Sequence, residues 1–132
     1  MSRATGKFDV QLAPQPPYNA AEDSLLGRMS LDKRFHGDLD ATSKGEMLTA
    51  GTSVDGSAGY VAIERVTGTL QGKQGGFTLL HSGTLMRGAP WLAVAVVPDS
   101  GTGELAGLSG TMSIEIVGGA HVYSFDYTLI DP

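Results

Sequence analysis

The sequence predicts an all-β fold in which eight antiparallel strands close into a single barrel. Almost every stretch alternates apolar and polar residues with period two, as half-buried strands do. No window carries an apolar stripe at helical spacing beyond two turns. The 19 glycines show no collagen-like period, which indicates many tight turns joining short strands.

The chain of 132 residues fits one domain, residues 1–132, with one hydrophobic core. A hydrophobic share of 41% and a charged share of 17% exclude a disordered chain. The lack of cysteine excludes disulfides, thiolate metal sites and cysteine nucleophiles, and suits a reducing compartment. Met1 to Val10 contains no apolar stretch of the kind a signal peptide has. No apolar run approaches the roughly 18 residues that a membrane span needs. We therefore expect a cytoplasmic protein.

The charge balance disfavours polyanionic partners. The formal net charge is -5 and the nine basic residues are scattered along the chain. Nucleic-acid binding draws much of its affinity from clustered Lys and Arg that displace counterions. We therefore expect no nucleic-acid partner and no anionic-membrane partner.

The eight strands are separated by turn-forming residues. They cover about Thr5 to Ala13, Leu25 to Gly37, Thr42 to Ser53, Gly59 to Gln71, Gln74 to Met86, Trp91 to Val97, Thr111 to Val117 and Ala120 to Ile130. Lys33 falls on the apolar side of the second strand, so we expect it near the open end of that face. Closure into a barrel removes exposed strand edges, and an eight-stranded barrel has room for its own side chains or one small ligand.

Turn residues also predict the register of two hairpins. A turn centred on Gly118-Gly119 places three apolar pairs on one face: Met112 with Phe125, Ile114 with Tyr123, and Ile116 with His121. A turn centred on Gly72-Lys73 places Val66 opposite Leu79 and Glu64 opposite His81.

Glu64 and His81 therefore meet on an apolar, inward face. Directly opposite residues have Cβ atoms about 4.5–5.5 Å apart, within hydrogen-bond reach of each other's side chains. A buried acid and imidazole pair because burying either alone is costly, and such pairs also act as general acid and base. Two interpretations stay open: a structural bridge, or a catalytic or ligand-contacting pair. A register slip of one residue would separate the two groups.

Four aromatic residues could line the same lumen and bind a ligand: Tyr60, Trp91, Tyr123 and Tyr127. The alternative is that they fill the core. Ala93 and Ala95 leave room for a cavity if they point inward. Glu46 faces Arg65 outside if Asp55-Gly56 is the turn, and faces the lumen if the loop is one residue longer.

The sequence does not predict a metal or another cofactor. His36 and His121 lie on strands distant from His81, so no cluster supplies three ligands. The segment Gly101 to Glu104 is no phosphate loop, because no helix and no Lys-Ser or Lys-Thr pair follows it.

Three ordered blocks resemble an uncharacterised bacterial family, the domain of unknown function thirty-two twenty-four. They are Gly59 to Leu70 (GYVAIERVTGTL), Gly76 to Thr84 (GFTLLHSGT) and Val97 to Gly110 (VPDSGTGELAGLSG), within a resemblance spanning Ala4 to Tyr127. The resemblance implies a barrel similar to those of the allene oxide cyclase and dirigent-like superfamily. Relatives there hold a hydrophobic substrate in the lumen and form dimers or trimers, which implies a homo-oligomer. The substrate-binding residues of the cyclase do not map onto this chain position by position.

Two functions remain. In the first, the lumen binds a small hydrophobic or amphipathic molecule, with Glu64 and His81 as polar anchor or as an acid-base pair for isomerase- or cyclase-type chemistry. In the second, the chain is a non-catalytic, oligomeric accessory or stress protein with a packed barrel. An open cavity beside His81 would favour the first, because a filled interior leaves no place for a ligand.

Overall fold

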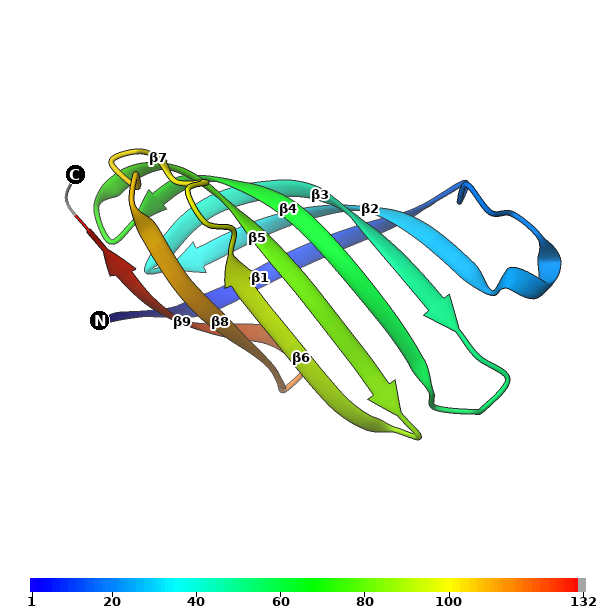
Figure 1. Cartoon of the computed structure of the whole chain (residues 1–132). Coiled ribbons are helices and arrows are strands. Elements are labelled where there is room, and N and C mark those ends of the chain that lie inside the picture. The colour runs from blue at the N-terminus through cyan, green and yellow to red at the C-terminus, as the bar shows by residue number, and fades with distance from the viewer. Residues whose placement is uncertain (131–132) are drawn as a thin grey trace.

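The computed structural model describes residues 1–130 and confirms the all-β barrel (Figure 1). Its long strands are β1 (Ser2–Gln15), β2 (Leu26–Gly37), β3 (Leu39–Gly51), β4 (Ala58–Leu70), β5 (Lys73–Met86), β6 (Ala89–Val96), β8 (Leu108–Val117) and β9 (Ala120–Leu129). Each corresponds to a predicted strand. Two short elements were not predicted: one 3-10 turn, η1 (Glu22–Ser24), and the two-residue strand β7 (Thr102–Gly103), which pairs with β5.

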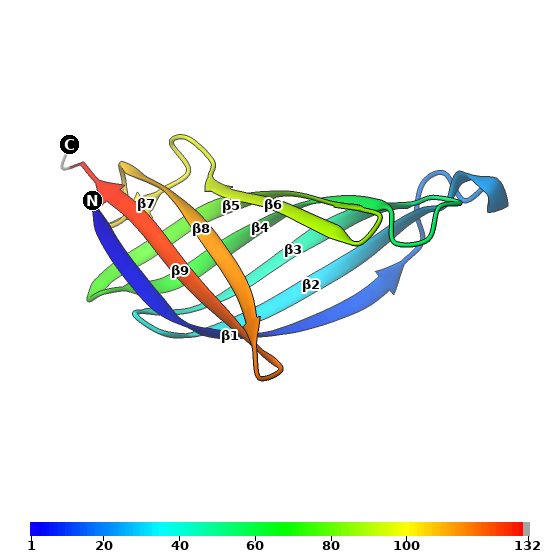
Figure 2. The same ribbon diagram turned by 90° about the horizontal axis from the view of Figure 1, so that it is seen from below.

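The strands close into a barrel in the order β4-β3-β2-β1-β9-β8-β6-β5, and pairing of β5 with β4 completes the circle. Every pairing is antiparallel, and most neighbours in space are neighbours in sequence. The pairing between the most distant strands in sequence is that of β1 with β9, which brings the two ends of the chain together (Figure 2). Among residues 1–130, no helix is long and apolar enough to cross a membrane.

One half of the barrel is solidly packed. The rings of Phe77 and Phe125 stack with centroids 5.7 Å apart, and Phe35 meets Tyr123 edge-on at 5.7 Å. All four side chains are buried, each contributing about 1.5–3 kcal/mol through the hydrophobic effect. Further buried members of this core are Ala4, Leu39, Val66, Leu70, Leu79, Leu105 and Leu108.

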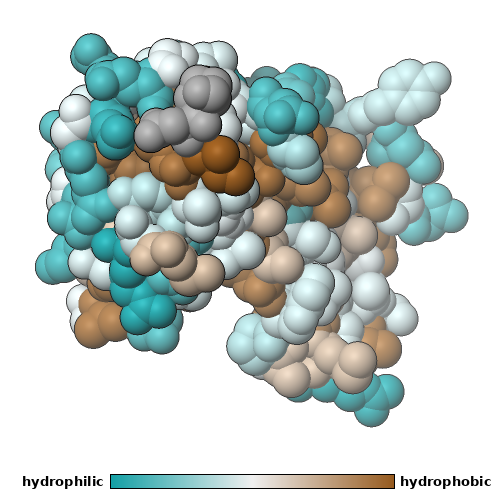
Figure 3. All heavy atoms as spheres, turned by 60° about the vertical axis from the view of Figure 1, so that its left-hand side comes forward, coloured by the Kyte–Doolittle hydropathy of each residue, from teal (hydrophilic) through white to brown (hydrophobic). Residues whose placement is uncertain are grey.

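The other half is open because β6 and β8 diverge. These strands share a single pair, Ala95 with Thr111, whereas β8 and β9 pair along their whole length. Both ribbon views show β6 continuing beyond the point where β8 turns away (Figures 1 and 2). The space-filling view shows hydrophobic residues at the surface beside hydrophilic ones (Figure 3). On the inner face of the diverging half, Leu12 and Leu92 are 46% and 39% exposed.

Of the two predicted hairpin registers, one is confirmed and the other was wrong. The β8–β9 register is confirmed, with Met112, Ile114 and Ile116 opposite the expected partners. The β4–β5 register was wrong by two residues, since Leu70 pairs with Lys73. The turn is centred on Gln71 and Gly72, both with positive φ, as a two-residue hairpin of this kind requires.

Glu46 lies on the outer face, but not opposite Arg65 as the Asp55-Gly56 turn predicted. It pairs with Ile63 across the β3–β4 ladder and forms an ion pair with Arg28. The loop between β3 and β4 spans residues 52–57, with Thr52 bonding to Val54 and Ser57 inside it, so it is longer than a two-residue turn.

Candidate functional site

A cluster of four polar side chains lies inside the barrel, centred on Glu64. The Nε2 atom of His81 lies 2.5 Å from Glu64 Oε2, and Lys33 Nζ lies 2.7 Å from the same oxygen. Ser43 donates its hydroxyl to Oε1 at 2.8 Å. Glu64 and His81 are therefore in contact as predicted, although the true register makes them diagonal neighbours: Glu64 pairs with Leu79. Diagonal neighbours on one sheet face remain within reach when the side chains are long.

Glu64 is an ionised carboxylate at neutral pH. Burial alone would raise its pKa, but the hydrogen bond from His81 and the charge and hydrogen bond of Lys33 outweigh burial and lower the pKa from 4.5 to about 2. An ionised carboxylate only accepts hydrogen bonds, so His81 donates from Nε2. Glu64 thus fixes which ring nitrogen of His81 carries the proton.

Lys33 is the member of the cluster that the sequence interpretation missed as a partner. Its side chain is only 7% exposed, and its ammonium lies 4.7 Å from the ring centroid of Phe8 and 5.7 Å from that of Phe35. The available signal was a lysine on an apolar strand face, because a buried cation requires a counter-charge and Glu64 lies on an inward face nearby.

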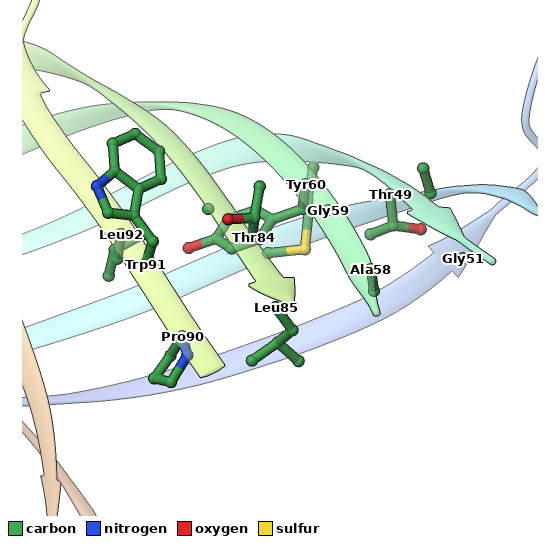
Figure 4. A pocket seen from close by; sticks show the side chains of 13 residues that line it. Thr49, Gly51, Ala58, Gly59, Tyr60, Thr84, Leu85, Pro90, Trp91 and Leu92 are labelled. Carbon is green, nitrogen blue, oxygen red and sulfur yellow. The ribbon is translucent and has the colours of Figure 1, made fainter. Parts of the chain in front are cut away.

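Two adjacent cavities occupy the open half of the barrel. The outer one has a volume of about 560 Å³, and the inner recess one of about 180 Å³. Three residues line both cavities: Met47, Tyr60 and Leu92. The outer cavity is otherwise lined by Thr49, Ala50, Gly51, Ala58, Gly59, Gly83, Thr84, Leu85, Pro90 and Trp91 (Figure 4). The inner recess is otherwise lined by Phe8, Val10, Leu12, Leu31, Lys33, Ala62, His81, Ile114 and His121.

His81 lines the inner recess. Nδ1 has no hydrogen-bond partner among residues 1–130, and within that range every fully buried polar side-chain atom has one. Nδ1 is therefore not sealed inside the protein. With Nε2 held by Glu64, Nδ1 is the ring nitrogen of His81 that has no partner in this part of the chain.

Tyr60 lines both cavities. Its ring packs on Gly83, where an added Cβ would lie 2.4 Å from the ring, so the glycine makes room for the aromatic side chain. Burial and the negative charge of Glu64 both raise the pKa of the Tyr60 phenol. In the described part of the chain the hydroxyl has no hydrogen-bond partner, so it is available to a ligand.

The other three predicted aromatics do not line the recess. Trp91 pairs with Thr84 on the outer face and is 58% exposed, and its indole leaves β6 in the opposite direction from Leu92 (Figure 4). Tyr123 donates its hydroxyl to the His36 carbonyl and accepts from the Leu39 N–H in the packed half.

Tyr127 is buried on Phe125 and donates its hydroxyl to Gln71. Ala93 and Ala95 also point outward, since they pair with Ser82 and Leu80 on the outer face. The room inside comes instead from the divergence of β6 and β8.

No cluster of three or more His, Asp or Glu side chains that could hold a metal ion occurs within residues 1–130. The candidate site consists of His81, Lys33 and Tyr60, which line the recess, with Glu64 behind them.

Comparisons with known proteins support the fold. The family model described as "Protein of unknown function (DUF3224)" matches residues 4–127. A crystal structure of a protein of unknown function of that family from Shewanella oneidensis MR-1 is 52% identical, with a TM-score of 0.95, and the alignment covers 100% of this chain and 99% of the other. The search of curated proteins finds no match. The likeness to allene oxide cyclase stays a prediction.

Proposed function

This chain belongs to the DUF3224 family, and we propose that it binds a small amphipathic molecule in the lumen of its barrel. The observation that carries the proposal is the cavity that opens beside His81. A fully packed interior, which the accessory-protein alternative requires, is not what the open half contains.

The size and lining of the cavity suit such a ligand. Small-molecule sites have volumes of about 300–1,000 Å³ and are mostly apolar with a few polar groups that orient the ligand. The outer cavity, about 560 Å³, lies in that range. Its walls of Met47, Leu85, Pro90 and Leu92 would cover the apolar body of a ligand. The polar groups gather at the inner end, which would receive the polar end of the ligand.

A second candidate function is proton transfer on the bound molecule, in the manner of an isomerase or cyclase. It is favoured by the dyad geometry: Glu64 Oε2 lies 2.5 Å from Nε2 of His81, which leaves Nδ1 as the base of a side chain that lines the recess. Glu64 lines neither cavity, so it would be a positioning residue, and His81 the catalytic one.

Binding is tested by a screen of amphipathic molecules monitored by thermal unfolding. A ligand at a hundredfold its Kd adds about 2.7 kcal/mol of apparent stability. For a chain of this size, that raises the Tm by roughly 10 °C. Hits are then measured by calorimetry against two matched variants. Ala58→Trp fills the outer cavity and should abolish binding, whereas Val61→Trp adds the same ring on the outer face and should leave binding unchanged.

His81→Gln separates the two candidate functions. Glutamine can still donate to Glu64, so the fold should persist while the affinity for the ligand falls. If hits bind Ala58→Trp as well as they bind the natural chain, the lumen is not the site. Turnover of a hit that disappears in His81→Gln but survives in Val61→Trp supports proton transfer.

A further inference from the structure

The polar side chains that face the inner recess are all hydrogen-bond donors or bases. They are Lys33, Tyr60, His81 and His121. Neither the recess nor the outer cavity is lined by an aspartate or glutamate of residues 1–130. Among the described residues, the lining of the two cavities thus holds one charged side chain, Lys33, and no acid, in a protein whose formal net charge is -5.

The one acid nearby is turned away from the cavity. Glu64 is fully buried and lines neither cavity. Its Oε2 accepts from Lys33 and His81, and its Oε1 accepts from Ser43. A ligand that enters the recess therefore reaches the ammonium of Lys33 before the carboxylate of Glu64.

The remaining walls carry no charge that would change this balance. Apart from Lys33, Tyr60 and the two histidines, every described residue that lines the recess is apolar. The ring of His121 stacks on Phe8 at 5.0 Å, on the same side of the recess as the Lys33 ammonium, which lies 4.7 Å from that ring.

We infer that the polar end of the ligand is an anion, most simply a single carboxylate on an apolar chain. This inference rests on the proposed binding function and names the class of ligand. The Lys33 ammonium has three N–H donors, and one of them donates a hydrogen bond to Glu64. Hydrogen bonds from charged donors to a carboxylate are about twice as strong as neutral ones. A cationic head group would meet Lys33 without an accessible acid to pair with.

Three probes with the same apolar chain test the charge of the head group: dodecanoate, dodecanol and dodecyltrimethylammonium, each below its micelle concentration. Calorimetry on the natural chain should rank dodecanoate at least tenfold tighter than dodecanol, and the ammonium compound weakest. Dodecanol binding as tightly as dodecanoate would overturn the inference and leave the proposed function standing. If none of the three binds, both are wrong, and Ala58→Trp shows whether any binding lies in the lumen.

A double variant assigns the preference to the cluster. Lys33→Met combined with Glu64→Gln removes both charges together, which a folded barrel tolerates better than the loss of one. Dodecanoate should then bind no tighter than dodecanol. If the preference for dodecanoate persists in this variant, Lys33 is not its source. Should the variant not fold, the probe series on the natural chain still decides the inference.

Discussion

Replacing Glu64 with glutamine tests how far the buried carboxylate stabilises the barrel. The pKa of Glu64 is lowered from 4.5 to about 2, and one pKa unit corresponds to about 1.4 kcal/mol. The ionised form in the folded state therefore contributes about 3 kcal/mol at neutral pH. Glu64→Gln also leaves the ammonium of Lys33 buried without its counter-charge, a change that typically costs about 3–5 kcal/mol.

The same argument fixes the sign of the acid response. A carboxyl whose folded-state pKa lies below its unfolded value stabilises fully above the unfolded value, here 4.5, and loses that contribution as the pH falls toward about 2. The natural chain should lose about 3 kcal/mol over this window through Glu64. Glu64→Gln should lack that part of the acid response because glutamine does not titrate.

The assay is urea unfolding followed by far-UV circular dichroism at pH 7 and at several values between pH 5 and pH 2. Lys33→Met with Glu64→Gln is the matched control, since it leaves no unpaired charge and should recover most of the lost stability. Glu64→Gln unfolding at the same urea concentration as the natural chain at pH 7 would refute the reasoning.

Two further substitutions test the packing of the barrel. Gly45→Ala should lower the free energy of unfolding by about 3 kcal/mol, because its Cβ would lie 2.1 Å from the carbonyl oxygen of Ile63. Gly59→Ala, whose Cβ would meet nothing nearer than 3.7 Å, is the control and should change it by less than about 1 kcal/mol; equal effects would contradict the argument. Tyr123→Phe should cost about 1–3 kcal/mol in urea unfolding, since it leaves the buried N–H of Leu39 without its acceptor, and an unchanged midpoint would speak against that hydrogen bond.

The alternation of apolar and polar residues predicted which face of the sheet each side chain lies on. It did not predict equally well which residues pair across neighbouring strands. Moving the centre of the β4–β5 turn by one residue changes each partner by two, and a change of two keeps every side chain on its face. Glu64 and His81 therefore lie on the inner face and in contact, as predicted. The prediction that they pair directly opposite each other was wrong. Where the turn was fixed by two consecutive glycines, at Gly118-Gly119, the register was correct as well.

Alternation could not orient β6, because both of its faces are apolar. Trp91, Ala93 and Ala95 lie outside, whereas Leu92, Val94 and Val96 lie inside, and no polar residue separates the two sets. The open cavity was equally out of reach of the sequence. It arises where β6 and β8 stop pairing after Ala95 and Thr111, and no turn residue marks that point.

The position of the charged cluster links the two halves of the barrel. On one side of Glu64 along β4 lies Val66, buried in the packed core, and on the other lies Ala62, which lines the inner recess. The cluster thus lies between the inner recess and the packed core. An apolar pair in place of Lys33 and Glu64 would pack there with equal or greater stability, so folding alone does not require the charges. If the double variant folds as well as the natural chain and still prefers dodecanoate to dodecanol as the natural chain does, the cluster is structural. Stability retained with the preference for carboxylate lost places the function at the cluster.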